Sequence, residues 1–203
     1  MFSLVREINL LWEQVYPYLA RHIAEVYDRT DGAVLEAGPF CGVIYDLARQ
    51  HIGTSFRIAS FPASMEAFYA EEIKKRGMTG MIDTVMTTPT LKGVDDNSID
   101  LLVFRGALFF PSFFTIDYQA ILRVLKPGGT MFAGGGFGKY TPAEVIRPIA
   151  ERSRKLNLLI GKTEVTVDRI RRDLETNNIT ENAGIVTEGG LWVVMKKWVI
   201  GDG

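Results

Sequence analysis

The stretch VLEAGPFCG, which ends at Gly42, holds residues that could position a small ligand through the main chain. Glu36 supplies a carboxylate, while Gly38 and Gly42 allow a close approach to the backbone. An apolar strand precedes the stretch and an amphipathic run follows it, so the loop would open a helix whose free amides attract polar ligands. Phe40 stands between the glycines, where another glycine would be expected. We predict a ligand-binding loop, although a strand-to-helix turn without a ligand would use the same residues.

The composition limits the partners that this loop could serve. The chain has 203 residues, of which 47% are hydrophobic, and this suits one α/β domain with a buried core. Its 23 basic and 24 acidic residues nearly cancel, and no block of Lys and Arg interleaved with aromatic residues occurs, so we expect no nucleic-acid partner. One cysteine and two histidines exclude an intramolecular disulfide and are too few for a structural zinc site, so we expect no metal.

The first 22 residues carry charges among their apolar positions, unlike a signal peptide or a membrane span. We therefore expect a cytoplasmic protein that binds a small molecule and does not enter a membrane. The oligomeric state is left open between a monomer and a homodimer, because an exposed apolar helix at the N-terminus would favour pairing.

Hydrophobic periodicity predicts the elements that must position the loop. Residues 4–26 show the pattern of an amphipathic helix with a break near Pro17, and we predict an N-terminal helical cap that consists of residues 1–31. After this cap, strands at 33–37, 56–60, 82–86, 99–104 and 130–133 alternate with helices at 43–51, 64–76 and 115–125. Such alternation is typical of a mostly parallel sheet with both faces covered, here spanning residues 32–203 in a single domain.

The end of the chain follows a different pattern. Helices at 142–156 and 165–175 precede two strands, 184–188 and 191–199, which only the pair Gly189 and Gly190 separates. So short a connection permits only a hairpin, so we predict that the last two strands are antiparallel.

Four segments together resemble the class I S-adenosylmethionine-dependent methyltransferases, in particular the small-molecule group related to ubiquinone and menaquinone methyltransferases. VLEAGPFCG is similar to their first motif, in which D/E-x-G-x-G-x-G follows hydrophobic residues, and DDNSIDLLVFRGALFF is similar to their fourth-strand motif. YQAILRVLKPGGTMFAGGG and GGLWVVMKK resemble the later strands. The resemblance implies a Rossmann-like, doubly wound, seven-stranded sheet with helices on both faces, an antiparallel C-terminal hairpin and an N-terminal helical lid.

The resemblance also implies S-adenosyl-L-methionine as the cofactor and assigns residues to it. These residues are Glu36, Gly38, Phe40, Gly42, Ser60, Phe61, Thr87, Thr88 and Arg105. Three positions depart from the family pattern: Phe40 replaces the middle glycine, Ser60 replaces the acid that grips the ribose, and Thr88 or its neighbour replaces the adenine-binding aspartate. Losing the charged bidentate acceptor at Ser60 alone costs about 1.5–3 kcal/mol.

Residues for the acceptor and for catalysis follow from the same comparison. Phe109 and Phe110 occupy the loop where the family often has histidine, and Tyr16 lies in the lid, so we assign these three to the substrate. The catalytic residue is left open, with Arg105, Tyr27 and His22 as candidates; the alternatives are an exposed structural arginine, a packed tyrosine and a structural histidine.

The sequence thus predicts an enzyme that transfers a methyl group in line from S-adenosylmethionine to a small, apolar or aromatic acceptor. The alternative is a methyltransferase-fold protein that binds a ligand without catalysis or takes a different nucleotide-like ligand.

Overall fold

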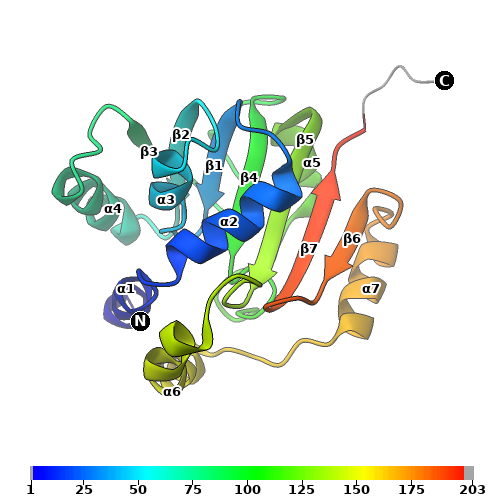
Figure 1. Cartoon of the computed structure of the whole chain (residues 1–203). Helices are drawn as coiled ribbons and strands as arrows, with labels where there is room; N and C mark the ends of the chain where they lie inside the picture. Colours follow the sequence, from blue (N-terminus) through cyan, green and yellow to red (C-terminus); the bar gives the residue numbers. More distant parts are fainter. Residues whose placement is uncertain (1, 199–203) are drawn as a thin grey trace.

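The computed structural model describes residues 2–198 (Figure 1). The helices are α1 (Phe2–Leu11), α2 (Tyr16–Tyr27), α3 (Ile44–Arg49), α4 (Ser64–Lys75), α5 (Tyr118–Val124), α6 (Ala143–Ile160) and α7 (Val167–Thr176). The strands are β1 (Ala33–Ala37), β2 (Ser55–Ser60), β3 (Ile82–Met86), β4 (Ile99–Arg105), β5 (Leu125–Gly135), β6 (Ala183–Val186) and β7 (Leu191–Lys196). Strands and helices alternate from β1 to β5, as the apolar pattern predicts.

The seven strands form one sheet in the order β3-β2-β1-β4-β5-β7-β6. The first five of these strands are parallel, whereas β7 runs antiparallel to both β5 and β6. Every residue of the central strand β4 is buried, because a parallel strand in the middle of such a sheet is covered on both faces. The predicted Rossmann-like sheet with an antiparallel C-terminal hairpin is confirmed.

The N-terminal cap consists of two helices with a turn over residues 12–15 between them. Pro17 lies in the first turn of α2, where its missing N–H removes no helical hydrogen bond, so the break comes just before it. Helix α2 packs against α3, and α1 packs against α6. Figure 1 shows α1 and α6 beyond the carboxyl ends of the parallel strands, which is where this fold forms its crevice.

Several element boundaries differ from those expected, and for three elements the structure shows how. Helix α5 begins at Tyr118, because the Asp117 side chain accepts a hydrogen bond from the Ala120 amide and caps the helix there. Strand β5 starts before the KPGG turn, at Leu125, with a shift in its pairing to β4. Helix α6 continues to Ile160 and ends at Gly161, whose φ of 97° only glycine adopts easily. The expected end of the last strand at residue 199 lies outside the described residues.

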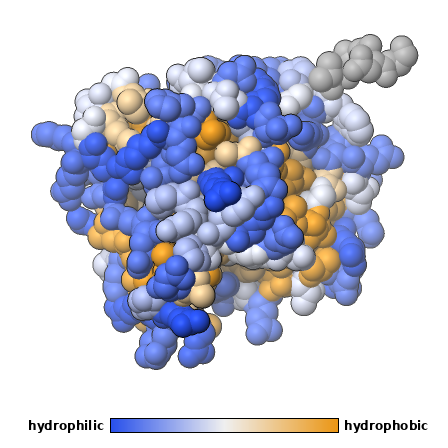
Figure 2. All heavy atoms as spheres, in the orientation of Figure 1, coloured by the Kyte–Doolittle hydropathy of each residue, from blue (hydrophilic) through white to orange (hydrophobic). Residues whose placement is uncertain are grey.

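The surface of the sheet end carries apolar side chains. Figure 2 shows them over β7 and β6, where Ile185, Val186 and Val194 are partly buried against the core. Among residues 2–198, no helix is long and apolar enough to cross a membrane.

Candidate functional site

The carboxyl end of β1 is organised by one buried side chain, that of Glu36. Its Oε2 atom accepts hydrogen bonds from the amides of Gly42 and Ile44, at 2.8 and 2.9 Å. Burial raises the pKa of Glu36, whereas the nearby charge of Arg105 and the amide donors lower it. The second oxygen, Oε1, has no hydrogen-bond partner within the described part of the chain. Glu36 therefore braces the loop with one oxygen and keeps the other for a further donor.

Side chains from α1 and α4 hold the rest of the loop. Asn9 and Tyr69 both donate to the Pro39 carbonyl, at 3.0 and 2.7 Å, and the Tyr69 hydroxyl also accepts from the Cys41 amide at 2.9 Å. The Cys41 thiol is buried and lies within hydrogen-bonding distance of the carbonyls of Glu36 and Gly38, and burial raises its pKa. Most polar groups of the loop are thus satisfied by the protein itself.

The protein's own aromatic rings fill the space that the two glycines open. A Cβ atom on Gly38 would lie 2.7 Å from the Phe104 ring, and one on Gly42 would lie 2.7 Å from the Tyr16 hydroxyl oxygen. Tyr16 is buried beneath the cap, and this burial raises its pKa to about 12. Tyr16, predicted as a substrate contact, therefore lies against the glycine loop and closes it.

A cluster of phenylalanine rings covers the neighbouring strand ends. Phe104 stacks on Phe114 with a centroid distance of 5.2 Å, and Phe61 meets both rings edge-on. Phe40 packs on Phe110 at 4.7 Å, so its ring turns away from the glycines into this apolar layer. The cluster occupies the volume beside Gly38 in which the sequence analysis predicts the cofactor.

The three polar residues expected near the ribose and adenine are in different situations. Ser60, at the end of β2, is fully buried, and its hydroxyl has no hydrogen-bond partner among residues 2–198. Thr87 donates to the Lys92 carbonyl at 2.8 Å, so its hydroxyl is already used within its own loop. Thr88 is exposed and pairs with the Thr90 hydroxyl at 2.8 Å. Ser60 alone of these three keeps its hydroxyl unpaired and enclosed.

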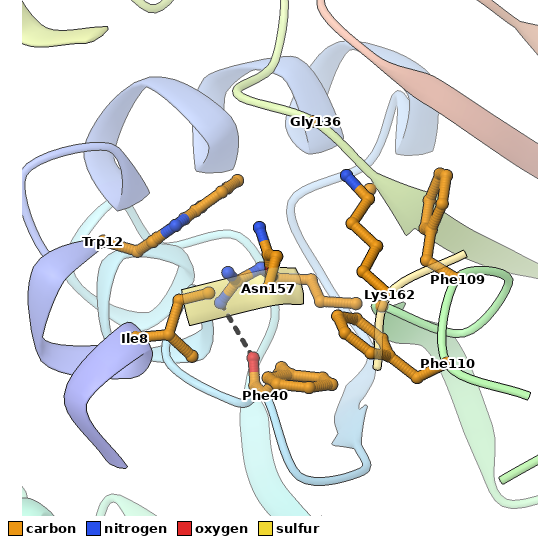
Figure 3. Close-up of a pocket in the computed structure, with 11 residues that line it drawn as sticks. Ile8, Trp12, Phe40, Phe109, Phe110, Gly136, Asn157 and Lys162 are labelled. Carbon is orange, nitrogen blue, oxygen red and sulfur yellow. Dashed lines mark hydrogen bonds between the residues drawn. The ribbon is translucent and has the colours of Figure 1, made fainter. Parts of the chain in front are cut away.

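Arg105, the last residue of β4, places a cation beneath the cap. Only 6% of its surface is exposed, and Nη1 donates to the Phe40 carbonyl at 2.8 Å (Figure 3). Its guanidinium carbon lies 4.9 Å from the centroid of the Trp12 ring and 4.6 Å from that of Tyr16. These aromatic faces attract the guanidinium, which would otherwise be costly to bury.

Two adjoining hollows open beside Arg105 at the carboxyl ends of β4 and β5. The inner chamber, of about 50 Å³, is lined by Phe40, Arg105, Phe109 and Phe110 together with residues of the cap. The outer cavity, of about 380 Å³, shares Trp12, Phe109, Gly135, Gly136, Asn157 and Lys162 with it and extends along α6. Figure 3 shows the inner chamber between the cap, the loop after β4 and the segment after α6. The outer cavity has the size of a small-molecule site.

Two catalytic candidates from the sequence lie outside these hollows. Tyr27 is near the amino end of β1, because its hydroxyl donates to the Asp31 carbonyl at 2.7 Å and approaches Gly32. Tyr27 therefore lies at the opposite end of the strands from the two hollows and lines neither of them, so the structure does not bring this catalytic candidate to the site. Its position follows from the direction of α2, which runs away from the carboxyl ends of the strands.

His22 is a packed histidine in the layer between α2 and the sheet. Its ring meets Phe132 and Trp192 edge-on at 5.3 and 6.5 Å, and 1% of its surface is exposed. Burial lowers its pKa below the usual value. Because it lines neither hollow, the structure does not bring this catalytic candidate to the site either.

Several cavity residues were not singled out from the sequence. Trp12, Asn157 and Lys162 come from the cap and from the end of α6, which lie far apart in the chain. In the sequence, a tryptophan in the turn after an amphipathic helix or a lysine after a helix-ending glycine does not by itself indicate a binding site. Only the packing of α1 against α6 reveals that they share a wall.

The strand order, with its reversal between β1 and β4, and the loop after β1 define the fold of the class I S-adenosylmethionine-dependent methyltransferases. A protein of Methanococcus maripaludis with a provisional assignment to these enzymes has a TM-score of 0.77 and 23% identity, covering 98% of this chain and 94% of its own. A SAM-dependent methyltransferase of Aquifex aeolicus has a TM-score of 0.63 and 14% identity, with 97% of each chain covered.

A further solved structure carries ligands. Geranyl diphosphate C-methyltransferase of Streptomyces coelicolor A3(2), in complex with Mg²⁺, geranyl diphosphate and S-adenosyl-L-homocysteine, has a TM-score of 0.56 and 11% identity over 89% of this chain and 79% of its own. At these identities the likeness establishes the fold. No family model and no curated protein matches the chain.

Proposed function

We propose that the protein is an S-adenosylmethionine-dependent methyltransferase that acts on a small, apolar or aromatic acceptor. The observation that carries this proposal is the pair of buried oxygens, Glu36 Oε1 and Ser60 Oγ, which have no hydrogen-bond partner within residues 2–198 and lie at the carboxyl ends of the adjacent strands β1 and β2. They lie next to the point where the strand order reverses, which is where this fold binds ligands. An unsatisfied buried oxygen costs about 1–3 kcal/mol, and a ligand donor would remove that cost.

Two of the proposed contacts use oxygens that have no hydrogen-bond partner among residues 2–198. Glu36 Oε1 is an acceptor for the amino group of the cofactor, and Ser60 Oγ is a partner for one ribose hydroxyl. Arg105 supplies a cation for the carboxylate, and Phe61 an apolar wall for the adenine. When bound, the cofactor supplies a methyl group on a sulfonium, whose transfer in line needs position and exclusion of water rather than a protein nucleophile.

The cofactor residues fit S-adenosylmethionine in chemical kind but are closed in this conformation. Tyr16 and Phe104 occupy the spaces over Gly42 and Gly38, and Phe114 stacks on Phe104. Binding therefore requires that these rings move, with the cap carrying Tyr16 and the segment after β4 carrying Phe114. Such gating by a lid is common in enzymes that must exclude water.

Calorimetric titration with S-adenosylhomocysteine tests the proposal directly. We expect the wild type to bind weakly and Ser60→Asp to bind about 10- to 100-fold more tightly, because a carboxylate accepts from both ribose hydroxyls. Ser64→Asp, an exposed change four residues away, is the matched control and should leave the affinity unchanged. Absence of heat and of thermal stabilisation at millimolar ligand, in the wild type and in Ser60→Asp alike, would contradict the proposal.

A second function is favoured by the closed loop itself. If the rings over Gly38 and Gly42 stay in place, the protein is a methyltransferase-fold binding protein whose ligand occupies the outer cavity alone. This alternative predicts that S-adenosylhomocysteine never binds, while a cavity ligand does.

A further inference from the structure

The outer cavity is lined by cationic side chains without any acidic one. Together the linings of the two hollows contain Arg105, Arg154 and Lys162, and neither lining includes an Asp or a Glu. None of the three cations makes an ion pair within residues 2–198. Arg152, which lies on α6 as Arg154 does, pairs by contrast with Glu7 of α1. The cavity is therefore a local excess of positive charge in a chain whose net charge is −1.

Main-chain hydrogen bonds hold the segment that carries Lys162. Gly161 ends α6 in the left-handed region, and the Lys162 amide then donates to the Asn157 carbonyl at 2.9 Å. The next amide, of Thr163, donates to the Phe109 carbonyl at 2.8 Å and ties this segment to the loop after β4. The Lys162 ammonium lies 4.8 Å from the centroid of the Phe109 ring, and Figure 3 shows the two side chains next to each other.

Partial desolvation acts on this ammonium as well. Lys162 as a whole residue is exposed, yet burial of its ammonium lowers the pKa, with no acidic group opposing that effect. A bound anion would supply the missing counter-charge.

Aromatic side chains form the walls of the cavity near the Lys162 ammonium. The Trp12 ring stacks on Phe137 at 4.8 Å with an interplanar angle of 12°, and its Nε1 donates to the Ser153 hydroxyl at 2.9 Å. Trp12 and Phe109 both line the two hollows, so an apolar ligand body would lie between held surfaces. A flat or chain-like apolar body fits such walls, because ligand pockets are mostly apolar with a few polar anchors.

We propose that the outer cavity binds a small organic anion, with its acidic group paired to Lys162 and its apolar body against Trp12 and Phe109. This inference rests on the proposed function in one respect, namely that the anion is the methyl acceptor. The inner chamber joins the cavity to Arg105 and Phe40, so the far end of such a ligand would face the glycine loop.

The test compares 3-phenylpropanoate with its neutral isostere 3-phenylpropanamide, using calorimetry and tryptophan fluorescence. We expect the carboxylate to bind at least about tenfold more tightly than the amide, because a charge-assisted contact distinguishes them. Lys162→Gln should abolish that ratio, and Lys162→Arg should retain most of it. Lys155→Gln is the matched control, since Lys155 lies on α6, which ends just before Lys162, pairs with Glu151 and does not line the cavity.

Three outcomes would overturn the inference: equal affinity for the two probes, an unchanged ratio in Lys162→Gln, or no binding of either probe at millimolar concentration. A parallel titration with S-adenosylhomocysteine separates the two proposals. Carboxylate binding without cofactor binding would overturn the methyltransferase assignment alone, whereas cofactor binding without carboxylate selectivity would overturn only the anion site.

Discussion

One oxygen of Glu36 receives two main-chain amides, and this double contact fixes the start of α3. The carboxylate could be recognised in the sequence because it follows an apolar strand and precedes two glycines. The different roles of its two oxygens could not be predicted, because they depend on the path of the backbone between Gly38 and Ile44. The same holds for Phe40, whose ring direction is set by contact with Phe110 rather than by its place in the loop.

Glu36→Gln should lower the free energy of unfolding by about 1–3 kcal/mol, because the amide side chain replaces two charge-assisted hydrogen bonds with weaker ones. Urea denaturation monitored by circular dichroism measures this difference. Glu151→Gln is the control, since Glu151 is an exposed member of a surface ion pair and should change stability little. Equal effects of the two substitutions would show that Glu36 does not brace the loop.

The elements were predicted well where the apolar period is long, and less well at their ends. The order of strands and helices from β1 to β7 follows from alternation and from the tight Gly189–Gly190 connection. The start of α5 and the end of α6 depend on caps at Asp117 and Gly161, which a hydrophobic period does not contain. Hydrophobic periodicity also does not indicate toward which end of the sheet a helix points, so it could not show that Tyr27 lies away from the hollows.

The contact between α2 and the glycine loop gives a prediction at the scale of elements. Gly42→Ala should destabilise the protein by about 1–3 kcal/mol, since the new methyl group overlaps the Tyr16 ring. Tyr16→Ala alone should cost about 3–5 kcal/mol through the cavity it leaves, and the double variant should cost less than the sum by about 0.5–3 kcal/mol.

A double-mutant cycle from urea denaturation supplies these values. Gly184→Ala is the reference substitution for the cycle, because its Cβ would meet nothing within 4 Å. Strict additivity of Tyr16→Ala with Gly42→Ala would mean that the ring does not occupy the glycine space.

For the whole molecule, the sequence predicted the sheet and the side of it on which the crevice lies. Arg105, Phe109 and Phe110 are brought together there because they follow one strand. Trp12 and Lys162 reach the same place only through the packing of α1 and α6 over the strand ends. The charge of the cavity is a property of that packing, so no local motif could have indicated it.

Global stability should depend on pH through His22, which links α2 to β5 and β7. Burial lowers its folded-state pKa, while the charge of Lys139 lowers it further and the charges of Glu25 and Glu188 raise it. The unfolded chain therefore binds the proton more readily, and stability should fall as the pH drops below about 6.5.

His22→Phe keeps an aromatic ring and removes this titration, so its free energy of unfolding should depend less on pH between about 7 and 5 than that of the wild type. Urea denaturation at several pH values measures both profiles. Parallel profiles for the two proteins would contradict the role of His22.

The single thiol of the chain makes the opening of the glycine loop measurable as a rate. Cys41 lies inside the loop that Tyr69, Glu36 and the cap hold closed. An alkylating reagent reaches such a sulfur only while the loop is open, so the rate of labelling equals the rate of opening when the reagent reacts faster than the loop recloses. Labelling of the native Cys41 thus measures the motion that would admit a cofactor, without a cysteine having to be introduced.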